Sequence, residues 1–403
     1  MKQIYISPKS TQKIQKGTRE LSEKDLTELP KGLTPGEWGI FSDEQRKIDY
    51  LGYINLFSEN FYKAKIVSIL NPEDKKSNEE QLIQKTLDLK INQAVRKRAL
   101  FDDYKNGHRL IYGMNDSLPG IIVDKYKKYV LVQINTAGMD KYREYIYQLL
   151  TKLNPEQKVI LFDNPEYRKA EVLPIHETTG LVEDLEIEEN GLKYLIDKSV
   201  VQKIGYYYDH RENRRKISEL IKRSKIEKES GIDLFSYVGS WGLHLLKAGI
   251  KNVDFVDQAD MEEVTKRHLK MNGFEGRGVF TRADVFKHLD KLIENQKLYN
   301  VVISDPPAFT KSEKNKAQGL SGYEKLHGKC LKIVKDEGFF VAASCTHYVN
   351  FEELDKTVQD AASKSNVSIQ LLDSGVQGFD HPMTGLSDKS FYIKYLVYLV
   401  NRG

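Results

Sequence analysis

The stretch from Ile232 to His244, IDLFSYVGSWGLH, has the pattern of a buried strand that passes through a tight turn into a helix. Its apolar start predicts the strand, and Gly239 and Gly242 mark the turn at which the helix opens. Such a turn lets the backbone approach a ligand closely. The Gly-x-x-Gly spacing differs from the GxGxxG of nicotinamide-binding folds, so a plain strand–helix connection explains this stretch equally well.

Strands and helices alternate on both sides of this stretch. A helical pattern, RENRRKISELIKRS, precedes it, and it is followed by the strand NVDFVDQA, the helix MEEVTKRHLKMNG and the strand VVISDPP. This alternation predicts right-handed βαβ units and a parallel sheet, which is an α/β fold. Because ligands of such folds bind beyond the carboxyl ends of the strands, we expect the chemistry in the loops that follow the strands.

The first two hundred residues have a different pattern. Residues 1–72 contain short apolar and aromatic runs broken by turn signals, which predict a small β-barrel or β-sandwich. Residues 73–200 begin with a Lys-rich helical connector and continue as mixed strands and helices to the hairpin signal in ENGLKYLID, which predicts an α+β domain. The alternating pattern then occupies a third domain, 201–403.

Composition narrows the classes of protein. The 62 Lys and Arg residues nearly balance the 58 Asp and Glu residues, so a nucleic-acid partner would have to meet a local basic face. The chain contains no apolar run of membrane-spanning length, and its first residues lack the apolar core of a signal peptide, so we expect a cytoplasmic protein. Cys330 and Cys345 are the only cysteines and have no metal-ligand spacing, which predicts free thiols and no metal site.

Three acidic residues follow successive strands of the alternating region. Asp233 ends the first strand, and Asp257 at the tip of the second is placed to hydrogen-bond a pair of ribose hydroxyls. Asp284 follows the third and could reach an adenine amino group. Asp257 and Asp284 could each cap a helix instead. Taken in order, the three predict one nucleoside site.

The stretch from Val301 to Phe309, VVISDPPAF, ends a buried strand abruptly because proline cannot donate to the ladder. Pro306 and Pro307 rigidify this strand end, so the carboxylate of Asp305 is held in a fixed direction, and the aromatic ring that follows can stack on a flat ring. An Asp-Pro-Pro corner followed by an aromatic residue favours methyl transfer to a nitrogen or carbon of a base.

Cys345 ends the next long strand, EGFFVAASCT, which should lie beside the strand of Asp305. A thiolate that adds to carbon 6 of cytosine makes carbon 5 nucleophilic, and a carboxyl group at N3 neutralises charge as the adduct forms. The alternative for Cys345 is a small buried core residue, the usual fate of a free cysteine. Polar neighbours favour the nucleophile. Cys330, inside an amphipathic helical pattern, is expected in the core.

These motifs together resemble the PUA-domain-containing 23S rRNA (cytosine-C5) methyltransferase family of class I S-adenosylmethionine enzymes. The resemblance covers essentially the whole chain and rests on KGLTPGEWGIF, LPGIIVDKY, QKIGYYYDHRENRR, DLFSYVGSWGLH, SDPPAF and SCT. The chain departs from the family at Ile204, where Thr is usual. It also lacks the second cysteine that related RNA cytosine-C5 methyltransferases have beside the equivalent of Asp305.

The resemblance implies a Rossmann-like class I methyltransferase domain preceded by a PUA-type RNA-binding barrel and a central α+β domain. It implies Cys345 as the nucleophile and Asp305 as the acid that contacts the base. The substrate would meet the corner formed by Pro306, Pro307 and Phe309. The residues implied around S-adenosylmethionine are those of the acidic series and the glycine turn, with two more from the preceding segment: Asp233, Gly239, Asp257, Asp284, Tyr206 and Asp209.

We therefore expect an S-adenosylmethionine-dependent enzyme that forms 5-methylcytosine in large-subunit rRNA, with RNA as its partner. One alternative is guanine-N2 or adenine-N6 methylation, for which the DPPAF corner would suffice without a covalent adduct. The other is an RNA-binding assembly factor with a vestigial cofactor fold. The sequence leaves the oligomeric state open, with a homodimer as one alternative.

Overall fold

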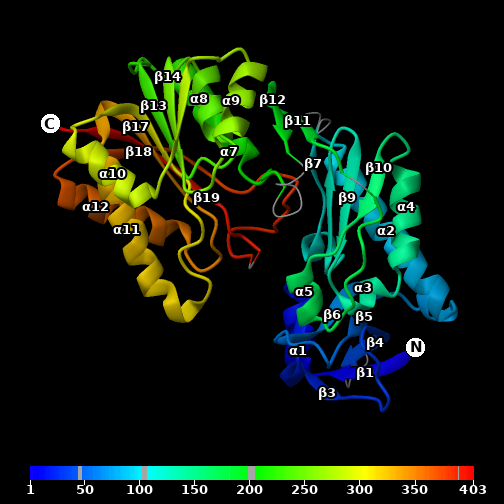
Figure 1. Cartoon of the computed structure of the whole chain (residues 1–403). Coiled ribbons are helices and arrows are strands. Elements are labelled where there is room, and N and C mark those ends of the chain that lie inside the picture. Colours follow the sequence, from blue (N-terminus) through cyan, green and yellow to red (C-terminus); the bar gives the residue numbers. More distant parts are fainter. Residues whose placement is uncertain (44–47, 102–106, 181, 198–204, 389) are drawn as a thin grey trace. The chain divides into compact units, whose positions relative to one another are not determined.

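The computed structural model describes two compact units, Met1–Leu185 and Glu186–Gly403, whose elements are labelled in Figure 1. None of the described helices is long and apolar enough to cross a membrane. The three-domain division at 1–72, 73–200 and 201–403 stays a prediction. The described residues are 1–43, 48–101, 107–180, 182–197, 205–388 and 390–403.

The first unit begins with a six-stranded mixed sheet in the order β2-β6-β5-β4-β1-β3. Helix α1 (Pro8–Gln15) starts with Pro8 in its first turn and Ser7 as N-cap, because the Ser7 side chain accepts from the amide of Ser10. The β-rich character predicted for this segment is confirmed, and its assignment as a PUA-type barrel stays a prediction. The strands are β1 (Lys2–Ile6), β2 (Glu20–Ser22), β3 (Leu26–Glu28), β4 (Glu37–Asp43), β5 (Asp49–Ile54) and β6 (Tyr62–Leu70).

A four-stranded sheet, in the order β10-β9-β8-β7, and helix α2 (Glu79–Arg98) complete the first unit. This part shares a hydrophobic core with the first sheet, because Trp38 Nε1 donates to Gly138 O at 2.8 Å and the ring of Tyr53 packs where a side chain at Gly138 would lie. The remaining elements are β7 (His108–Tyr112), β8 (Ile121–Lys125), β9 (Tyr129–Ile134), α3 (Ala137–Asp140), α4 (Arg143–Leu153), β10 (Lys158–Leu161) and α5 (Pro165–Ala170).

A hairpin of β11 (Leu185–Glu189) and β12 (Leu192–Ile196) lies at the start of the second unit, and its first residue, Leu185, is the last of the first unit. Its turn is made by Asn190 and Gly191, whose φ angles of 51° and 71° are those of a two-residue hairpin loop. The hairpin predicted from Asn-Gly is therefore confirmed.

The second unit is built on a seven-stranded sheet in the order β15-β14-β13-β16-β17-β19-β18. Parallel pairing joins β13, β14, β15, β16 and β17, as the strand–helix alternation predicts, and β19 is inserted antiparallel beside β17. The strands are β13 (Ser230–Leu234), β14 (Asn252–Asp257), β15 (Gly278–Arg282), β16 (Tyr299–Ser304), β17 (Val334–Ser344), β18 (Ser368–Gly375) and β19 (Lys394–Asn401).

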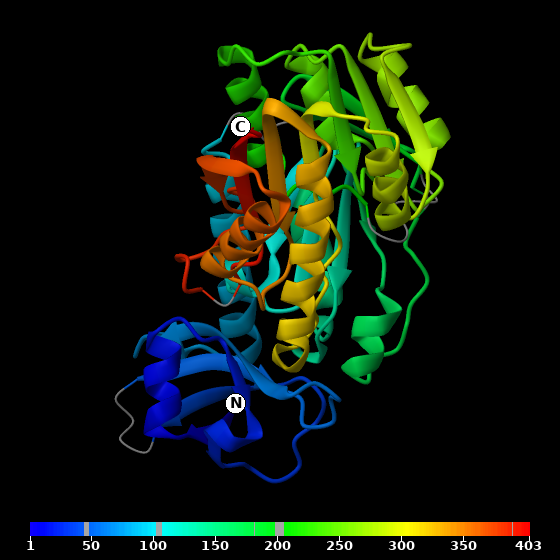
Figure 2. The same cartoon turned by 90° about the vertical axis from the view of Figure 1, so that its left-hand side faces the viewer.

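Among the described residues of this unit, six helices cover the sheet on its two faces. In Figures 1 and 2 the yellow-to-orange helices α10, α11 and α12 lie on one face, and the green helices α7, α8 and α9 lie on the other. All six residues of β16 are buried, as a central parallel strand requires. The strand order reverses at β13, which places a ligand crevice at its carboxyl end. The helices are α7 (Arg211–Arg223), α8 (Ser240–Lys247), α9 (Glu262–Met271), α10 (Val285–Glu294), α11 (Lys316–Lys332) and α12 (Phe351–Ser365).

Candidate active site

The carboxyl ends of β16 and β17 meet in the second unit. The two strands are parallel neighbours, with Ser304 paired to Ala342, and the Sγ of Cys345 lies 3.7 Å from the carbonyl oxygen of Pro306. The expected proximity of the cysteine to the Asp-Pro-Pro corner is therefore confirmed. Cys345 is partly exposed, whereas Cys330 is fully buried in α11, as its sequence context predicts.

The Asp-Pro-Pro corner differs from residue to residue in its exposure. Pro306 is buried, Pro307 is exposed and Phe309 is half-buried. The ring of Phe309 packs against the ring of Tyr323 in α11, with 4.7 Å between the centroids. This contact anchors the corner to the helix, and stacking of Phe309 on a substrate stays a prediction.

Trp241 holds the carboxylate of Asp305 by a hydrogen bond, and the ring of His210 lies nearby. Trp241 Nε1, at the start of α8, donates to Asp305 Oδ2 at 2.8 Å, and His210 Nε2 lies 3.6 Å from Asp305 Oδ1. The other ring nitrogen of His210 lies 3.1 Å from the amide nitrogen of Asn213. Because an amide nitrogen only donates, His210 Nδ1 is the acceptor of this contact. The Asp305 carboxylate has a set direction before any substrate arrives.

The surroundings of Cys345 disfavour its thiolate. Burial raises the pKa of the Cys345 thiol to about 12, and the negative charges of Asp305 and Asp209 act in the same direction. A thiol with a pKa in this range is protonated at neutral pH, so a nucleophilic role for Cys345 needs a compensating cation.

Lys394, the first residue of β19, supplies a cation beside this cysteine. It is paired with Ser344 across the antiparallel ladder and is 1% exposed. Its Nζ donates to the carbonyl oxygens of Thr346 at 2.5 Å and Tyr392 at 3.2 Å. Sequence analysis did not single out Lys394, because its place beside Cys345 depends on the insertion of β19.

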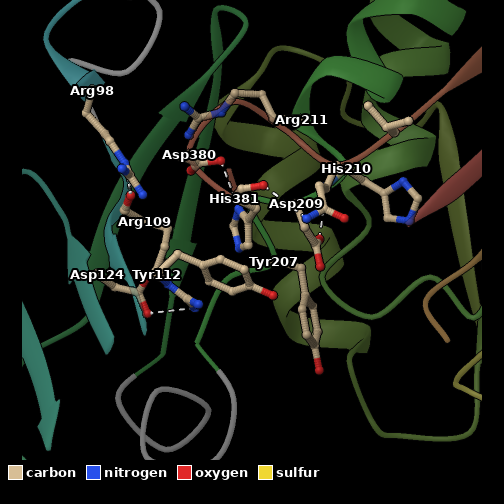
Figure 3. Close-up of polar contacts among 12 residues, drawn as sticks. Arg98, Arg109, Tyr112, Asp124, Tyr207, Asp209, His210, Arg211, Asp380 and His381 are labelled. Carbon is tan, nitrogen blue, oxygen red and sulfur yellow. Dashed lines mark hydrogen bonds and ion pairs between the residues drawn. The ribbon is translucent and has the colours of Figure 1, made fainter. Parts of the chain in front are cut away.

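Asp209 joins the segment before α7 to the loop between β18 and β19. Its Oδ2 accepts from the hydroxyl of Tyr392 at 2.8 Å, and its main-chain oxygen accepts from the amide of Gly378 at 2.8 Å. The same loop contains Asp380 and His381, whose Oδ1 and Nδ1 lie 2.9 Å apart (Figure 3). Asp209, which the resemblance predicts to cover the cofactor, therefore connects two segments of the chain close to Cys345.

The run of three tyrosines before α7 separates into buried and exposed rings. Tyr206 is 3% exposed and donates its hydroxyl to Glu189 Oε2 at 3.0 Å. Tyr207 is 47% exposed, and its ring contacts that of Tyr237 (Figure 3 shows Tyr207 beside Asp209). The pKa of Tyr207 is raised to about 12, mainly by partial burial. The negative charges of Asp209, Cys345 and Asp305 act in the same direction. Tyr207 therefore lies near the reactive strand ends, whereas Tyr206 is tied to the core.

The turn after β13 requires its two glycines for different reasons. Gly239 is the N-cap of α8 and has a φ of 80°, which L-residues with side chains rarely adopt. At Gly242 an added Cβ would lie 2.1 Å from the ring of Phe255, so the helix packs on β14 only with glycine there. Asp233 is fully buried and accepts from the amide of Gly242 at 2.8 Å, and its burial raises its pKa well above the usual value. Asp233 thus holds this turn from beneath.

The two later acidic residues have different local roles. Asp257 accepts from the amides of Tyr237 and Ala259, both at 2.8 Å, and it does not cap α9, whose N-cap is Met261. Each Asp257 oxygen has a further lone pair, as a contact with ribose hydroxyls requires. Asp284 is exposed and caps α10 through the amide of Lys287. The glycine turn and Asp257 together fit a nucleoside at the point where the strand order reverses.

Residues 202–204 of the QKIGYYYDHRENRR signature, including Ile204, lie outside the described residues. Within the described part of the chain, no three His, Cys, Asp or Glu side chains are grouped as ligands for a metal ion.

Known proteins show clear similarity to this chain. The family model described as S-adenosylmethionine-dependent methyltransferase matches residues 147–361. The chain is 31% identical over 313 residues to the ribosomal RNA large subunit methyltransferase I of Shewanella amazonensis, an alignment that covers 76% of this chain and 77% of that one. The protein of the same name from Aeromonas salmonicida is 31% identical over 317 residues, covering 77% and 78% of the two chains.

The fold is also that of a solved structure. A Streptococcus mutans protein described as a SAM-dependent methyltransferase superimposes with a TM-score of 0.76 over 99% of this chain and 100% of that chain, at 18% identity. At this identity the likeness concerns the fold alone, and it agrees with the class I α/β architecture predicted from the strand–helix alternation. The family match over more than half of the chain, together with relatives above 30% identity, shows that the protein belongs to the S-adenosylmethionine-dependent methyltransferase family, with S-adenosylmethionine as its cofactor.

Proposed function

We propose that this protein methylates carbon 5 of a cytosine in large-subunit rRNA, with Cys345 as the nucleophile. The observation that supports this most directly is the meeting of two strand ends, with Cys345 Sγ 3.7 Å from the Pro306 carbonyl and the Asp305 carboxylate held by Trp241. The relatives named ribosomal RNA large subunit methyltransferase I support the choice of RNA.

The chemistry assigns one role to each strand end. The Cys345 thiolate adds to carbon 6 of the cytosine, and Asp305, protonated from solvent, donates its proton to N3 and so neutralises the charge that moves into the ring; N3 returns this proton when the bond between sulfur and carbon 6 breaks. Carbon 5 becomes nucleophilic as a result, and S-adenosylmethionine, when bound, supplies the electrophilic methyl group. Loss of the carbon-5 proton to solvent then breaks the bond between sulfur and carbon 6 and restores the aromatic ring and the thiolate.

We assign the cofactor to the crevice beyond β13. Gly239 would let the backbone approach the ligand, Asp257 would bind the ribose hydroxyls and Asp284 would lie towards the adenine. Asp233 would act indirectly, through its hydrogen bond to Gly242. The exposed ring of Tyr207, rather than the buried Tyr206, is the better candidate for a contact with substrate or cofactor.

RNA binding is assigned to the first unit as a further part of this proposal. The resemblance to PUA-containing enzymes and the mixed six-stranded sheet support a PUA-type domain over 1–72, followed by the central domain over 73–200 and the methyltransferase domain over 201–403. A substrate in rRNA would place the reaction in the cytoplasm.

The test combines a covalent trap with a matched pair of cysteine variants. With RNA that contains 5-fluorocytidine, the fluorine cannot leave as a proton does, so the wild-type protein should accumulate an adduct that survives denaturing electrophoresis. Cys345→Ala should form no adduct and no 5-methylcytidine, as measured by mass spectrometry of nucleosides. Cys330→Ala should still form the adduct and 5-methylcytidine, because Cys330 is fully buried in α11 and its thiol cannot reach a substrate.

The opposite outcome is equally informative. Methylation of RNA by Cys345→Ala at the wild-type rate would refute the covalent route and would favour guanine-N2 or adenine-N6 methylation. Absence of S-adenosylmethionine binding in calorimetry, with RNA binding intact, would favour a non-catalytic assembly factor.

A further inference from the structure

Lys394 occupies a position that is unusual for a lysine. Its side chain is 1% exposed, yet the contacts that hold its Nζ are two main-chain carbonyls, those of Thr346 and Tyr392, and the ring of Phe391 at 4.7 Å. Burial of an ammonium group is unfavourable unless it meets an opposite charge. A lysine in this position therefore calls for an anion that forms nearby.

The group that fits this requirement is the thiol of Cys345. Lys394 is paired with Ser344 in the strand ladder and donates to the carbonyl of Thr346, so its contacts lie on the residues immediately before and after Cys345. We propose that Lys394 is a positioning residue whose ammonium group stabilises the thiolate of Cys345. This inference rests on the proposed function, which makes that thiolate the nucleophile.

The charges around the pair set the direction of the effect. Among the described residues, the acidic groups that act on the thiol of Cys345 are Asp305, Asp209, Tyr207 and Tyr323, and Glu353 acts on the amine of Lys394. Lys394 is a cation that opposes the acidic groups around the thiol. Loss of the thiol proton to a buffer base places a thiolate beside the buried ammonium group, and the attraction between the two charges favours the thiolate.

The pH dependence follows from the titration of Lys394 itself. Burial lowers the pKa of Lys394 to about 8, although the thiolate and Glu353 oppose this. Lys394 is therefore mostly charged at pH 7 and loses its charge as the pH rises through about 8. Its help to the thiolate should be greatest below this pH and should fade above it.

The experiment measures thiol reactivity without RNA or cofactor. Wild type, Lys394→Met and Lys394→Arg are alkylated with iodoacetamide between about pH 6 and 10, and the peptide containing Cys345 is quantified by mass spectrometry. At pH 7 we expect Lys394→Met to react about tenfold more slowly than wild type, which is about one unit in the thiol pKa. Lys394→Arg should keep the wild-type rate at pH 7 and should exceed it above pH 8, because arginine does not titrate there.

Several results would overturn the inference. If Lys394→Met and wild type have superimposable profiles, or if Lys394→Met and Lys394→Arg slow alkylation equally, Lys394 has only a packing role. Cys330, which is fully buried in α11, serves as an internal control, because its alkylation would reveal loosening of the fold. If Lys394→Met does not fold, the Lys394→Arg profile decides alone, and a Lys394→Arg profile that coincides with that of wild type above pH 8 refutes the proposal.

The outcomes separate this inference from the proposed function. The alkylation profiles report only on the Lys394–Cys345 pair, whereas the adduct with 5-fluorocytidine RNA reports on catalysis. A shifted profile together with full methylation by Cys345→Ala would leave the pair intact and refute the covalent reaction.

Discussion

The N–H group of Trp241 allows a sharp test of how Asp305 is held. Replacing Trp241 with Phe keeps an aromatic ring against Tyr395, which is stacked at 5.9 Å, and removes the 2.8 Å hydrogen bond to Asp305 Oδ2. A hydrogen bond to a charged group contributes about 1.5–3 kcal/mol. Because the Asp305 side chain is 20% exposed and water can replace part of the bond, we expect a loss of about 1.5–2 kcal/mol.

That loss predicts a rate effect that can be measured directly. If the hydrogen bond is needed to orient Asp305 in the transition state, Trp241→Phe should reduce the methyl-transfer rate by roughly ten- to thirtyfold. The assay is single-turnover transfer of a labelled methyl group from S-adenosylmethionine to RNA, with both partners saturating. Saturation separates a defect in the chemical step from a defect in binding.

A matched variant controls for the loss of the indole N–H. Trp38→Phe removes a hydrogen bond of the same length, from Trp38 Nε1 to Gly138 O, in the core of the first unit. Trp38→Phe should lower the thermal unfolding temperature about as much as Trp241→Phe does. It should nevertheless change the single-turnover rate less than about twofold. A folded Trp241→Phe protein that also stays within twofold of wild type would show that the Asp305 carboxylate needs no such support.

Two further predictions concern the framework of the second unit. Glu189→Gln should lower the free energy of unfolding by about 3–5 kcal/mol at pH 7, because Arg214 loses its buried charged partner at 2.6 Å. Burial would raise the pKa of Glu189, but Arg214 holds this pKa at about 2. The difference in free energy of unfolding between Glu189→Gln and wild type, measured in urea, should therefore shrink as the pH falls from about 4 to 2. A difference that does not change with pH would contradict this prediction. Gly242→Ala places a Cβ 2.1 Å from the ring of Phe255 and should lower the free energy of unfolding by about 1–3 kcal/mol. It should also weaken S-adenosylmethionine binding, as measured by calorimetry. In Gly328→Ala the Cβ meets only Ala361 at 4.0 Å, so binding should be unchanged, and equal effects of the two changes would refute the packing argument.

Much of the second unit was predictable because its signals are local. Alternating strand and helix patterns predict the parallel sheet, and a parallel sheet brings consecutive strand ends to one edge. The proximity of Cys345 to the Asp-Pro-Pro corner follows from that rule, as does the place of Asp257 at a strand end. The burial of Cys330 follows from its amphipathic helix.

Only the tertiary structure decided which groups surround the reactive side chains. Trp241 lies 64 residues before Asp305 and reaches it because β13, which leads into α8, pairs with β16. Lys394 reaches the residue after Cys345 across a separation of 48 residues, through the antiparallel insertion of β19. Tyr206 and Tyr207 are adjacent and identical in type, yet one is buried against Glu189 and the other is half exposed. Hydrophobic periodicity records which face of an element is buried, whereas the partner of a charge or a hydrogen-bond donor depends on strand register and on segments distant in the chain. The residues at the strand ends can therefore be found from the sequence, whereas the residues that contact and orient them can be identified only in the tertiary structure.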